Sequence, residues 1–289
     1  MRLGVKMTDY VAKITDLHVR RPTFEVDGVS LTLSRGTVVG LVGPNGAGKT
    51  TVIRALLGLL VPESGGVEVF GRPAGAPQAL ARTGIVLDQP TAAPEWRVNS
   101  LGRRLAPFYP GWNSDRFSEL LDRLSVPPGQ RLGDLSRGQG VKCSLAVALA
   151  QSPELLILDE PSSGLDPASR RNIGDLIREF MLDPSHTVLF STHITTDLDS
   201  LADELVVLVD GQIAYQGALL DAAEEFAMAR GSGLAPTAPF ISLERSGEQW
   251  SALIRMSDSA AFGPEVIIDS ASIDDIVIHL ASQRREVAA

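Results

Sequence analysis

Cysteine and lysine are both scarce in this sequence, and each shortage narrows what the chain can do. A single cysteine, Cys143, excludes an internal disulfide and a zinc site built from cysteines, and it fits a reducing cytosol. Lysine occurs only at positions 6, 13, 49 and 142, so arginine carries most of the positive charge. Acidic residues outnumber basic ones by 35 to 26, for a net charge of −9. This balance gives no electrostatic reason to expect a nucleic-acid partner.

Long apolar runs are missing as well. The longest, Cys143–Ala150 and Leu205–Val209, fall well short of the roughly 18 residues that cross a bilayer. The first residues, Met1–Tyr10, lack the apolar segment of a secretion signal. We therefore expect a cytoplasmic protein that acts at a membrane only by docking onto another protein.

Short apolar runs alternate with helical patterns up to about residue 220, which predicts an α/β fold. The predicted strands are Ile14–Leu17, Val29–Leu33, Thr37–Val42, an antiparallel edge strand at Gly65–Phe70, and the buried strands Gly84–Leu87, Leu155–Leu158 and Val188–Phe190. The predicted helices are Thr51–Leu60 and Ala168–Met181, with a further helical pattern between Trp96 and Val126 in which Phe117, Leu120, Leu121 and Leu124 share one face.

The pattern changes after residue 220. The stretch Gly231–Pro239 has the glycine, proline and small residues of a linker. Two strands, Trp250–Met256 and Glu265–Ile268, and a short amphipathic helix, Ile273–Ala281, are predicted beyond it. With 289 residues, the chain fits one large domain followed by a small α+β appendage.

The strongest motif lies between a predicted strand and a predicted helix and satisfies G-x-x-x-x-G-K-[ST]. It consists of Gly43, Pro44, Asn45, Gly46, Ala47, Gly48, Lys49 and Thr50, with Thr51 following. Glycines let consecutive backbone N–H groups turn toward phosphate oxygens, and the helix N-terminus adds a positive dipole. Lys49 can reach the β- and γ-phosphates, and Thr50 can ligate Mg²⁺. A plain glycine-rich turn capping a helix is the alternative interpretation.

A second motif ends the strand Leu155–Leu158 with two acids, Asp159 and Glu160. Open α/β sheets bind their ligands at the carboxyl ends of the strands. Asp159 would hold Mg²⁺ through water, and Glu160 would orient and polarise the attacking water. The alternative is a strand whose terminal acids are merely solvated.

Three further segments resemble known sequence motifs of ATP-binding proteins. Leu135–Gln139 (LSRGQ) looks like an LSGGQ signature with its helix, Val141–Ala150, after it. Pro161–Asp166 looks like a D-loop, and Ser191–His193 looks like a switch histidine at a strand end. In this order and spacing, the chain resembles ABC-transporter ATP-binding subunits from Ile14 to about Leu220. The alternative interpretation of His193 is a buried histidine that makes its hydrogen bonds within the core and has no functional role.

The resemblance implies a P-loop NTPase (RecA-like) core with an antiparallel β subdomain and a helical subdomain. The nucleotide-binding domain would span residues 1–220, its helical subdomain about 96–150, and the appendage 221–289. Two subunits would pair head to tail around MgATP, so that Ser136, Gly138 and Gln139 of one contact the γ-phosphate held by the other. His193 would contact that phosphate within its own chain, and Asp166 would report across the interface.

Three positions depart from the family pattern. Arg137 replaces the third residue of the signature. Ungapped alignment puts Asp88 at the Q-loop glutamine, a catalytic position, whereas a one-residue shift restores Gln89. Arg20, Arg21 and Pro22 occupy the stretch where an aromatic usually stacks on adenine, with Phe24 nearby, so adenine stacking is in doubt and weak base selectivity is a hypothesis.

The aromatic segment Pro107–Trp112 is interpreted either as local core or as a groove that receives a helix of a membrane permease. With the Q-loop departure, it looks most like single-cassette ATPases of bacterial antibiotic and small-solute exporters. The leading hypothesis is therefore a transport ATPase at the inner face of the cell membrane, working as a homodimer or beside a related ATPase. A non-transport ABC ATPase of translation, repair or assembly is the alternative, and a GTPase lacks its Asn-Lys-x-Asp motif. The cargo and its direction are not encoded here.

Overall fold

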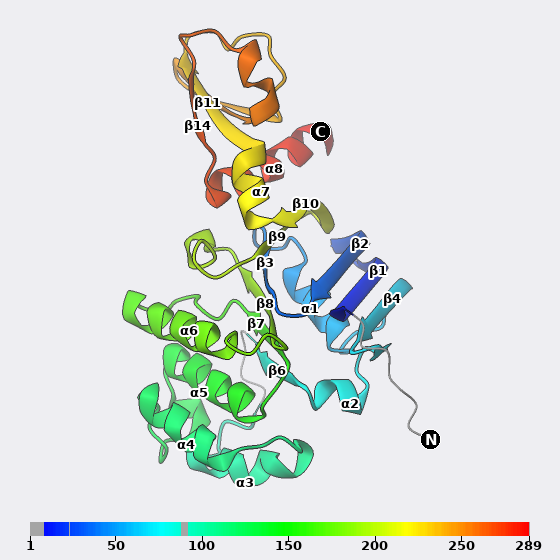
Figure 1. Cartoon of the computed structure of the whole chain (residues 1–289), viewed down its shortest axis with the longest axis vertical. Helices are drawn as coiled ribbons and strands as arrows, with labels where there is room; N and C mark the ends of the chain where they lie inside the picture. Colours follow the sequence, from blue (N-terminus) through cyan, green and yellow to red (C-terminus); the bar gives the residue numbers. More distant parts are fainter. Residues whose placement is uncertain (1–8, 23, 88–91, 289) are drawn as a thin grey trace.

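The architecture centres on a six-stranded, mostly parallel sheet, seen in a computed structural model that describes residues 9–22, 24–87 and 92–288 (Figure 1). Its strands, in spatial order, are β10 (Gln212–Ala218), β9 (Glu204–Val209), β3 (Val38–Val42), β8 (Thr187–Thr192), β7 (Leu155–Asp159) and β6 (Thr83–Val86). Only β10 runs antiparallel to its neighbour. Strands β3, β7 and β8 are buried along their whole length, as predicted for strands covered on both faces.

Alternate side chains of these strands enter two separate hydrophobic clusters, because successive residues of a strand point to opposite faces. Val38 and Val42 pack with α5 (Arg137–Ala150) and α6 (Pro167–Phe180). Val39 and Leu41 pack with α1 (Lys49–Leu56) and an antiparallel sheet. That second sheet has the order β2 (Phe24–Ser34), β1 (Tyr10–Arg21), β4 (Ser64–Val69) and β5 (Arg72–Pro73). The core therefore has three layers.

Several element boundaries differ from the sequence prediction, and two of these differences have a clear structural cause. The predicted edge strand Gly65–Phe70 corresponds to β4, but the two-residue β5 pairs with its outer side, so β4 is not an edge. The helix predicted over Thr51–Leu60 ends at Leu56 instead. Gly58 adopts a left-handed φ of 67°, and a Cβ there would lie 2.5 Å from the Cα of Gly75. A glycine in this conformation terminates a helix, and the close approach admits no other residue.

The helical subdomain is more broken than the sequence pattern suggested. Short turns at η1 (Val98–Ser100), α3 (Leu101–Leu105) and η2 (Ala106–Phe108) precede α4 (Ser114–Arg123). Prolines at 107 and 110 interrupt the predicted run because proline cannot continue a helix. The predicted face of α4 is confirmed, since Phe117, Leu120 and Leu121 are all buried.

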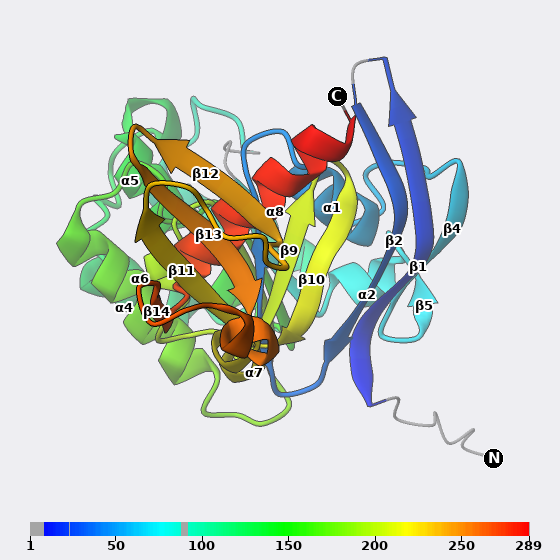
Figure 2. The same ribbon diagram turned by 90° about the horizontal axis from the view of Figure 1, so that it is seen from above.

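The C-terminal part forms a four-stranded antiparallel sheet with two helices. Its elements are α7 (Leu219–Glu225), β11 (Phe226–Ser232), β12 (Ser242–Ser246), β13 (Gln249–Arg255), η5 (Met256–Ala261), β14 (Ile267–Ser270) and α8 (Ile273–Ala288). It stands at one end of the molecule (Figure 1), and α8 lies along β9 (Figure 2). The linker expected from Gly231 onward is wrong for its first two residues, which belong to β11.

The appendage is not packed as a separate unit. Phe226 and Met228 of β11, together with Ile276 and Leu280 of α8, belong to the same buried cluster as the inner faces of α5 and α6. A second, smaller cluster around Trp250 lies within the appendage sheet. The division at residue 220 therefore stays a prediction, with a continuous hydrophobic core across it.

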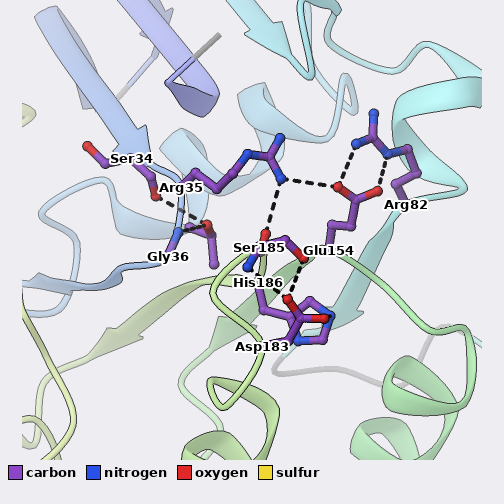
Figure 3. Close-up of polar contacts among 9 residues, drawn as sticks. Ser34, Arg35, Gly36, Arg82, Glu154, Asp183, Ser185 and His186 are labelled. Carbon is purple, nitrogen blue, oxygen red and sulfur yellow. Dashed lines mark hydrogen bonds and ion pairs between the residues drawn. The ribbon is translucent and has the colours of Figure 1, made fainter. Parts of the chain in front are cut away.

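The amino ends of the parallel strands are tied together by ion pairs (Figure 3). Glu154, just before β7, accepts two hydrogen bonds of 2.6 Å from Arg82, just before β6. Arg35, just before β3, reaches Glu154 at 3.2 Å and the carbonyl of Ser185 at 3.2 Å. The Arg82 hydrogen bonds, ahead of the other contacts, lower the pKa of Glu154, and burial opposes them.

Removing the Glu154 charge should destabilise the chain. We expect Glu154→Gln to lower the free energy of unfolding at pH 7 by about 1–2 kcal/mol, a discounted figure because the carboxylate is part-exposed. A carboxylate whose folded pKa is lowered contributes stability above its unfolded pKa of about 4.3 and loses it as pH falls through the folded value. The difference from wild type should therefore shrink in urea titrations between pH 5 and pH 3. An equal difference at every pH would contradict this, and exposed Glu95→Gln is the control.

Candidate functional site

The turn between β3 and α1 has the shape of an anion cradle. Gly46 and Gly48 adopt left-handed φ angles of 84° and 109°, and Gly48 is the N-cap of α1. A Cβ on Gly48 would lie 2.8 Å from the ring of Phe24, and one on Gly43 would lie 2.1 Å from the carbonyl oxygen of Leu208. Only glycine fits at these two positions, so the backbone of the turn can curve around a phosphate.

Lys49 is the buried cation of this turn, with 6% of its surface exposed. Its Nζ donates to the carbonyl oxygen of Gly43 at 2.7 Å and lies 3.3 Å from Glu160 Oε1. A buried ammonium costs free energy unless it is paired and hydrogen-bonded, and both conditions are met here. The lysine that follows β3 and the glutamate that follows β7, which the sequence predicted to meet, are therefore in contact.

A hydroxyl and a carboxylate are brought together as expected for a magnesium site. Thr50 Oγ1 donates to Asp159 Oδ2 at 3.0 Å, and Ser191 Oγ donates to the other oxygen of Asp159 at 2.6 Å. Asp159 is only 2% exposed, so the interpretation of this acid as merely solvated is wrong. Hard oxygen ligands from a hydroxyl and a carboxylate, beside a phosphate cradle, suit Mg²⁺. Sequence reasoning missed the anchoring role of Ser191, although its place at the end of the neighbouring strand could have indicated it.

Glu160 is held at its backbone and at its side chain. It adopts a left-handed φ of 51°, which is costly for a residue with a Cβ and is typical of functional sites. Its N–H donates to the carbonyl of Ser191 at 3.0 Å, and its Oε2 lies 2.6 Å from His193 Nδ1. The His193 side chain is 40% exposed, so the interpretation as a buried core histidine is wrong.

The turn between β3 and α1 and the Glu160 side chain border one pocket of about 340 Å³. It is lined by Phe24, Asn45, Gly46, Ala47, Gly48, Lys49, Thr50, Thr51 and Glu160. Phe24, which lies just beyond Arg20 and Arg21 in the sequence, places an aromatic ring at this pocket. The face of this ring is a surface on which a base could stack. Phe24 is therefore the candidate for the aromatic that stacks on adenine, and stacking on it stays a prediction.

The signature residues lie outside this pocket. Among the described residues, none from 135 to 139 lines it. Ser136 is exposed and is the N-cap of α5, where its side chain and that of Gln139 bond reciprocally to each other's backbone N–H groups in a capping box. The helix therefore begins four residues before the predicted Val141, and Ser136, Gly138 and Gln139 sit on its first turn.

Two more predicted positions are placed by this part of the structure. Asp166 is the N-cap of α6 and accepts hydrogen bonds from the N–H groups of Ala168 and Ser169, each at 3.0 Å. The hydrogen bond from the Ser169 hydroxyl is the largest cause of the lowered pKa of Asp166. Arg137 is exposed, with its guanidinium against Gly164 of the loop before Asp166. Asp88 and Gln89 lie outside the described residues.

Comparison with known proteins agrees with this geometry. Residues 26–163 match the family model described as ABC transporter. The chain is 37% identical over 202 residues to Nod factor export ATP-binding protein I of Rhizobium sp. and 32% identical over 225 residues to an uncharacterized ABC transporter ATP-binding protein of Nostoc sp.. These alignments cover 66% and 75% of this chain, and 65% and 67% of the two relatives. The chain thus matches about two thirds of the length of each relative.

Solved structures show the same fold. One described as the ATP-binding subunit of an ABC transporter has a TM-score of 0.66 and 26% identity, covering 73% of this chain and 91% of that one. CbiO1 from Clostridium perfringens, described as part of the ABC transporter complex CbiONQ, has a TM-score of 0.59 and 25% identity, covering 73% of this chain and 89% of that one. The predicted P-loop NTPase fold class is confirmed by these similarities.

Proposed function

Because this chain belongs to the ABC transporter family, we propose that it binds and hydrolyses ATP as the nucleotide-binding subunit of a transporter. The observation that carries the proposal is the convergence of the Lys49 ammonium, the Thr50–Asp159 pair and the Glu160–His193 pair at the carboxyl ends of β3, β7 and β8. Phosphate binding, metal binding and water activation would thereby be supplied at one edge of the sheet. No observation favours the alternative of a non-transport ABC ATPase.

Each residue then has a distinct task. The backbone N–H groups of the turn and Lys49 would bind the β- and γ-phosphates, while Thr50 and Asp159 would hold Mg²⁺. The metal, when bound, neutralises charge on the phosphate oxygens. Glu160 would accept a hydrogen bond from the attacking water and take its proton, and His193 would contact the γ-phosphate. Preorganised charges in a pocket that excludes water stabilise a transferring phosphoryl group without reorganisation.

The position of the signature supports a site completed by a second subunit. Ser136 and Gln139 are held at the start of α5, a 14-residue helix, and neither lines the pocket at this chain's own phosphate turn. The exposed Ser136 and the positive end of the α5 dipole are available to a γ-phosphate held elsewhere. We propose that they act on nucleotide bound by a second copy of this chain or by a related ATPase subunit.

A groove of about 460 Å³ between the helical subdomain and the core supports a membrane partner. Its lining is mostly apolar and includes Leu59, Leu87, Trp96, Leu105, Tyr109, Leu135 and Val147. The segment Pro107–Trp112 has features of both a local core and a groove lining. Tyr109 lines the groove, whereas Trp112 packs on Phe117 with ring centroids 5.3 Å apart. An apolar groove of this kind fits an amphipathic helix. We propose that it receives a helix of the permease at the inner face of the membrane.

None of the helices in the described part of the chain has the length and hydropathy to cross a membrane. The cargo and the direction of transport would be determined by the permease partner and not by the residues above.

The transport role is tested by purifying the tagged chain from detergent-solubilised membranes. We expect a polytopic membrane protein to co-purify with wild type, and Leu59→Asp to reduce its recovery at least about tenfold, since a charge in an apolar contact costs several kcal/mol. Leu59 is 63% exposed, so the variant should fold and still bind ATP. Val61→Asp is the matched control, because Val61 is 90% exposed and lies outside the lining. Wild type that hydrolyses ATP but recovers no membrane protein would favour the non-transport alternative.

A further inference from the structure

The appendage touches the loop that carries His193. This loop leaves β8 at Thr192 and continues into the short turn η4 (Thr195–Asp197). The hydroxyl of Thr195 donates a hydrogen bond to the Asp274 carboxylate, which lies in the first turn of α8. Thr195 is only 4% exposed. A contact between residues 79 positions apart therefore joins the appendage to the chain two residues beyond His193.

The first turn of α8, which carries Asp274, is closed by a reciprocal pair of hydrogen bonds between its neighbours. Ser272 Oγ accepts from the N–H of Asp275 at 3.1 Å, and the Asp275 carboxylate accepts from the N–H of Ser272 at 3.0 Å. This reciprocal pair fixes the first turn of α8, where the helix dipole also favours the negative charge of Asp274. The carboxylate therefore meets Thr195 from a preorganised turn and not from a mobile loop.

Apolar packing between the segment after η4 and α8 supports the contact between Thr195 and Asp274. Leu198, which follows η4, is fully buried in the cluster that also contains Ile273, Ile276 and Leu280 of α8. Leu198 N donates to the carbonyl oxygen of Thr195 at 2.8 Å, so the turn and the buried leucine move together. The appendage thus fixes η4 by one buried hydrogen bond and by a shared hydrophobic core.

At its other end, the loop carries the contact to Glu160. His193 pairs with Glu160 Oε2 through Nδ1 at 2.6 Å, and its N–H lies 3.3 Å from the same oxygen. The N–H of Ile194 donates to Thr192 Oγ1 at 2.9 Å, which keeps the segment between His193 and Thr195 tight. A shift of η4 would therefore be transmitted to the imidazole and to the carboxylate beside it.

We propose that Asp274 is a positioning residue for ATP hydrolysis: through Thr195 it holds the His193 loop in the conformation that sets His193 against Glu160. The inference rests on the proposed ATPase function. It gives the appendage a direct role in the nucleotide site, since α8 supplies the far support of the switch-histidine loop. Loss of the contact leaves a buried hydroxyl unpartnered, and the loop samples other positions.

Two variants from opposite sides of the contact test this in the full chain. Asp274→Ala and Thr195→Val should each lower kcat at least about tenfold while the Kd for ATP changes less than twofold, because positioning errors of about 1 Å impair turnover more than binding. The double variant should be no slower than the worse single one, since both remove one interaction. Asp274→Asn keeps an acceptor oxygen and should restore most of the turnover.

Hydrogen exchange of the nucleotide-free chain gives a readout that does not depend on activity. Amides 193–198 should exchange faster in both disruptive variants, because the free energy of local opening is lowered. Asp269→Ala is the control, since it removes an exposed appendage ion pair with Arg230 at 2.8 Å and should change neither exchange nor turnover. Wild-type kcat and wild-type exchange in Asp274→Ala would overturn the inference. A wild-type chain that binds but does not hydrolyse ATP would overturn the proposed function instead. In that case, unchanged exchange of amides 193–198 in Asp274→Ala would still show that the Asp274 contact does not hold the loop.

Discussion

Glu160→Gln should abolish ATP turnover, with kcat reduced about 10²- to 10⁴-fold, while ATP binding persists. The carboxylate accepts a proton from water in the proposed reaction, and an amide of the same shape cannot. The expected loss is the usual contribution of a general base to the rate. Glu160 is also an ion-pair partner of Lys49 at 3.3 Å. Because the amide has no charge to hold Lys49, the ammonium is released to the phosphates and binding should not weaken.

The measurement combines phosphate release with sedimentation in MgATP. Wild type should cycle and stay largely monomeric, whereas the variant should accumulate as a dimer, since in the proposed cycle a closed pair reopens only after hydrolysis. Glu224→Gln, on the exposed surface of α7, is the matched control and should behave as wild type. Normal hydrolysis by Glu160→Gln would remove Glu160 from this role.

Lys49→Ala should weaken nucleotide binding itself, with the Kd for ATP raised roughly 100-fold, or about 2.7 kcal/mol. The lost contacts are charge-assisted hydrogen bonds to phosphate, each worth about 1.5–3 kcal/mol when formed in a buried site. Lys49 is almost fully buried, so no neighbouring solvent-exposed cation can replace it at that position.

Titration of the chain with ATP by calorimetry measures this effect. Lys13→Ala removes an exposed lysine of β1 and should leave the affinity unchanged. Equal ATP affinity for Lys49→Ala and wild type would refute the assignment of the turn between β3 and α1 as the phosphate cradle.

The sequence predicted the contacts of the site because they follow from the topology. Gly43–Thr50 and Asp159 come directly after apolar runs, His193 follows the run Val188–Phe190 by three positions, and parallel strands end at one edge of a sheet. The end of α1 could not be predicted in this way, because the approach of Gly58 to Gly75 depends on tertiary packing. The two-residue β5 and the polar strand β12 are too short or too irregular to give an alternating pattern.

Interactions that depend on distant partners were also missed. The contact between Thr195 and Asp274 joins two residues of ordinary appearance, and no local spacing connects them. Phe24 could be seen near the expected aromatic position, but its approach to Gly48 is a tertiary contact between β2 and the N-terminus of α1. The start of α5 at Arg137 was detectable, since Ser136 and Gln139 have the spacing of a capping box.

A crystal structure of Glu160→Gln grown with MgATP tests the central claim most directly. The expected density has the triphosphate wrapped by residues 43–50, Lys49 on its terminal phosphates, and a magnesium ion between Thr50 and Asp159. Ser136 of another subunit should reach the γ-phosphate from the opposite side. Nucleotide bound away from Lys49, or a metal out of reach of Asp159, would contradict the convergence of these residues on one MgATP.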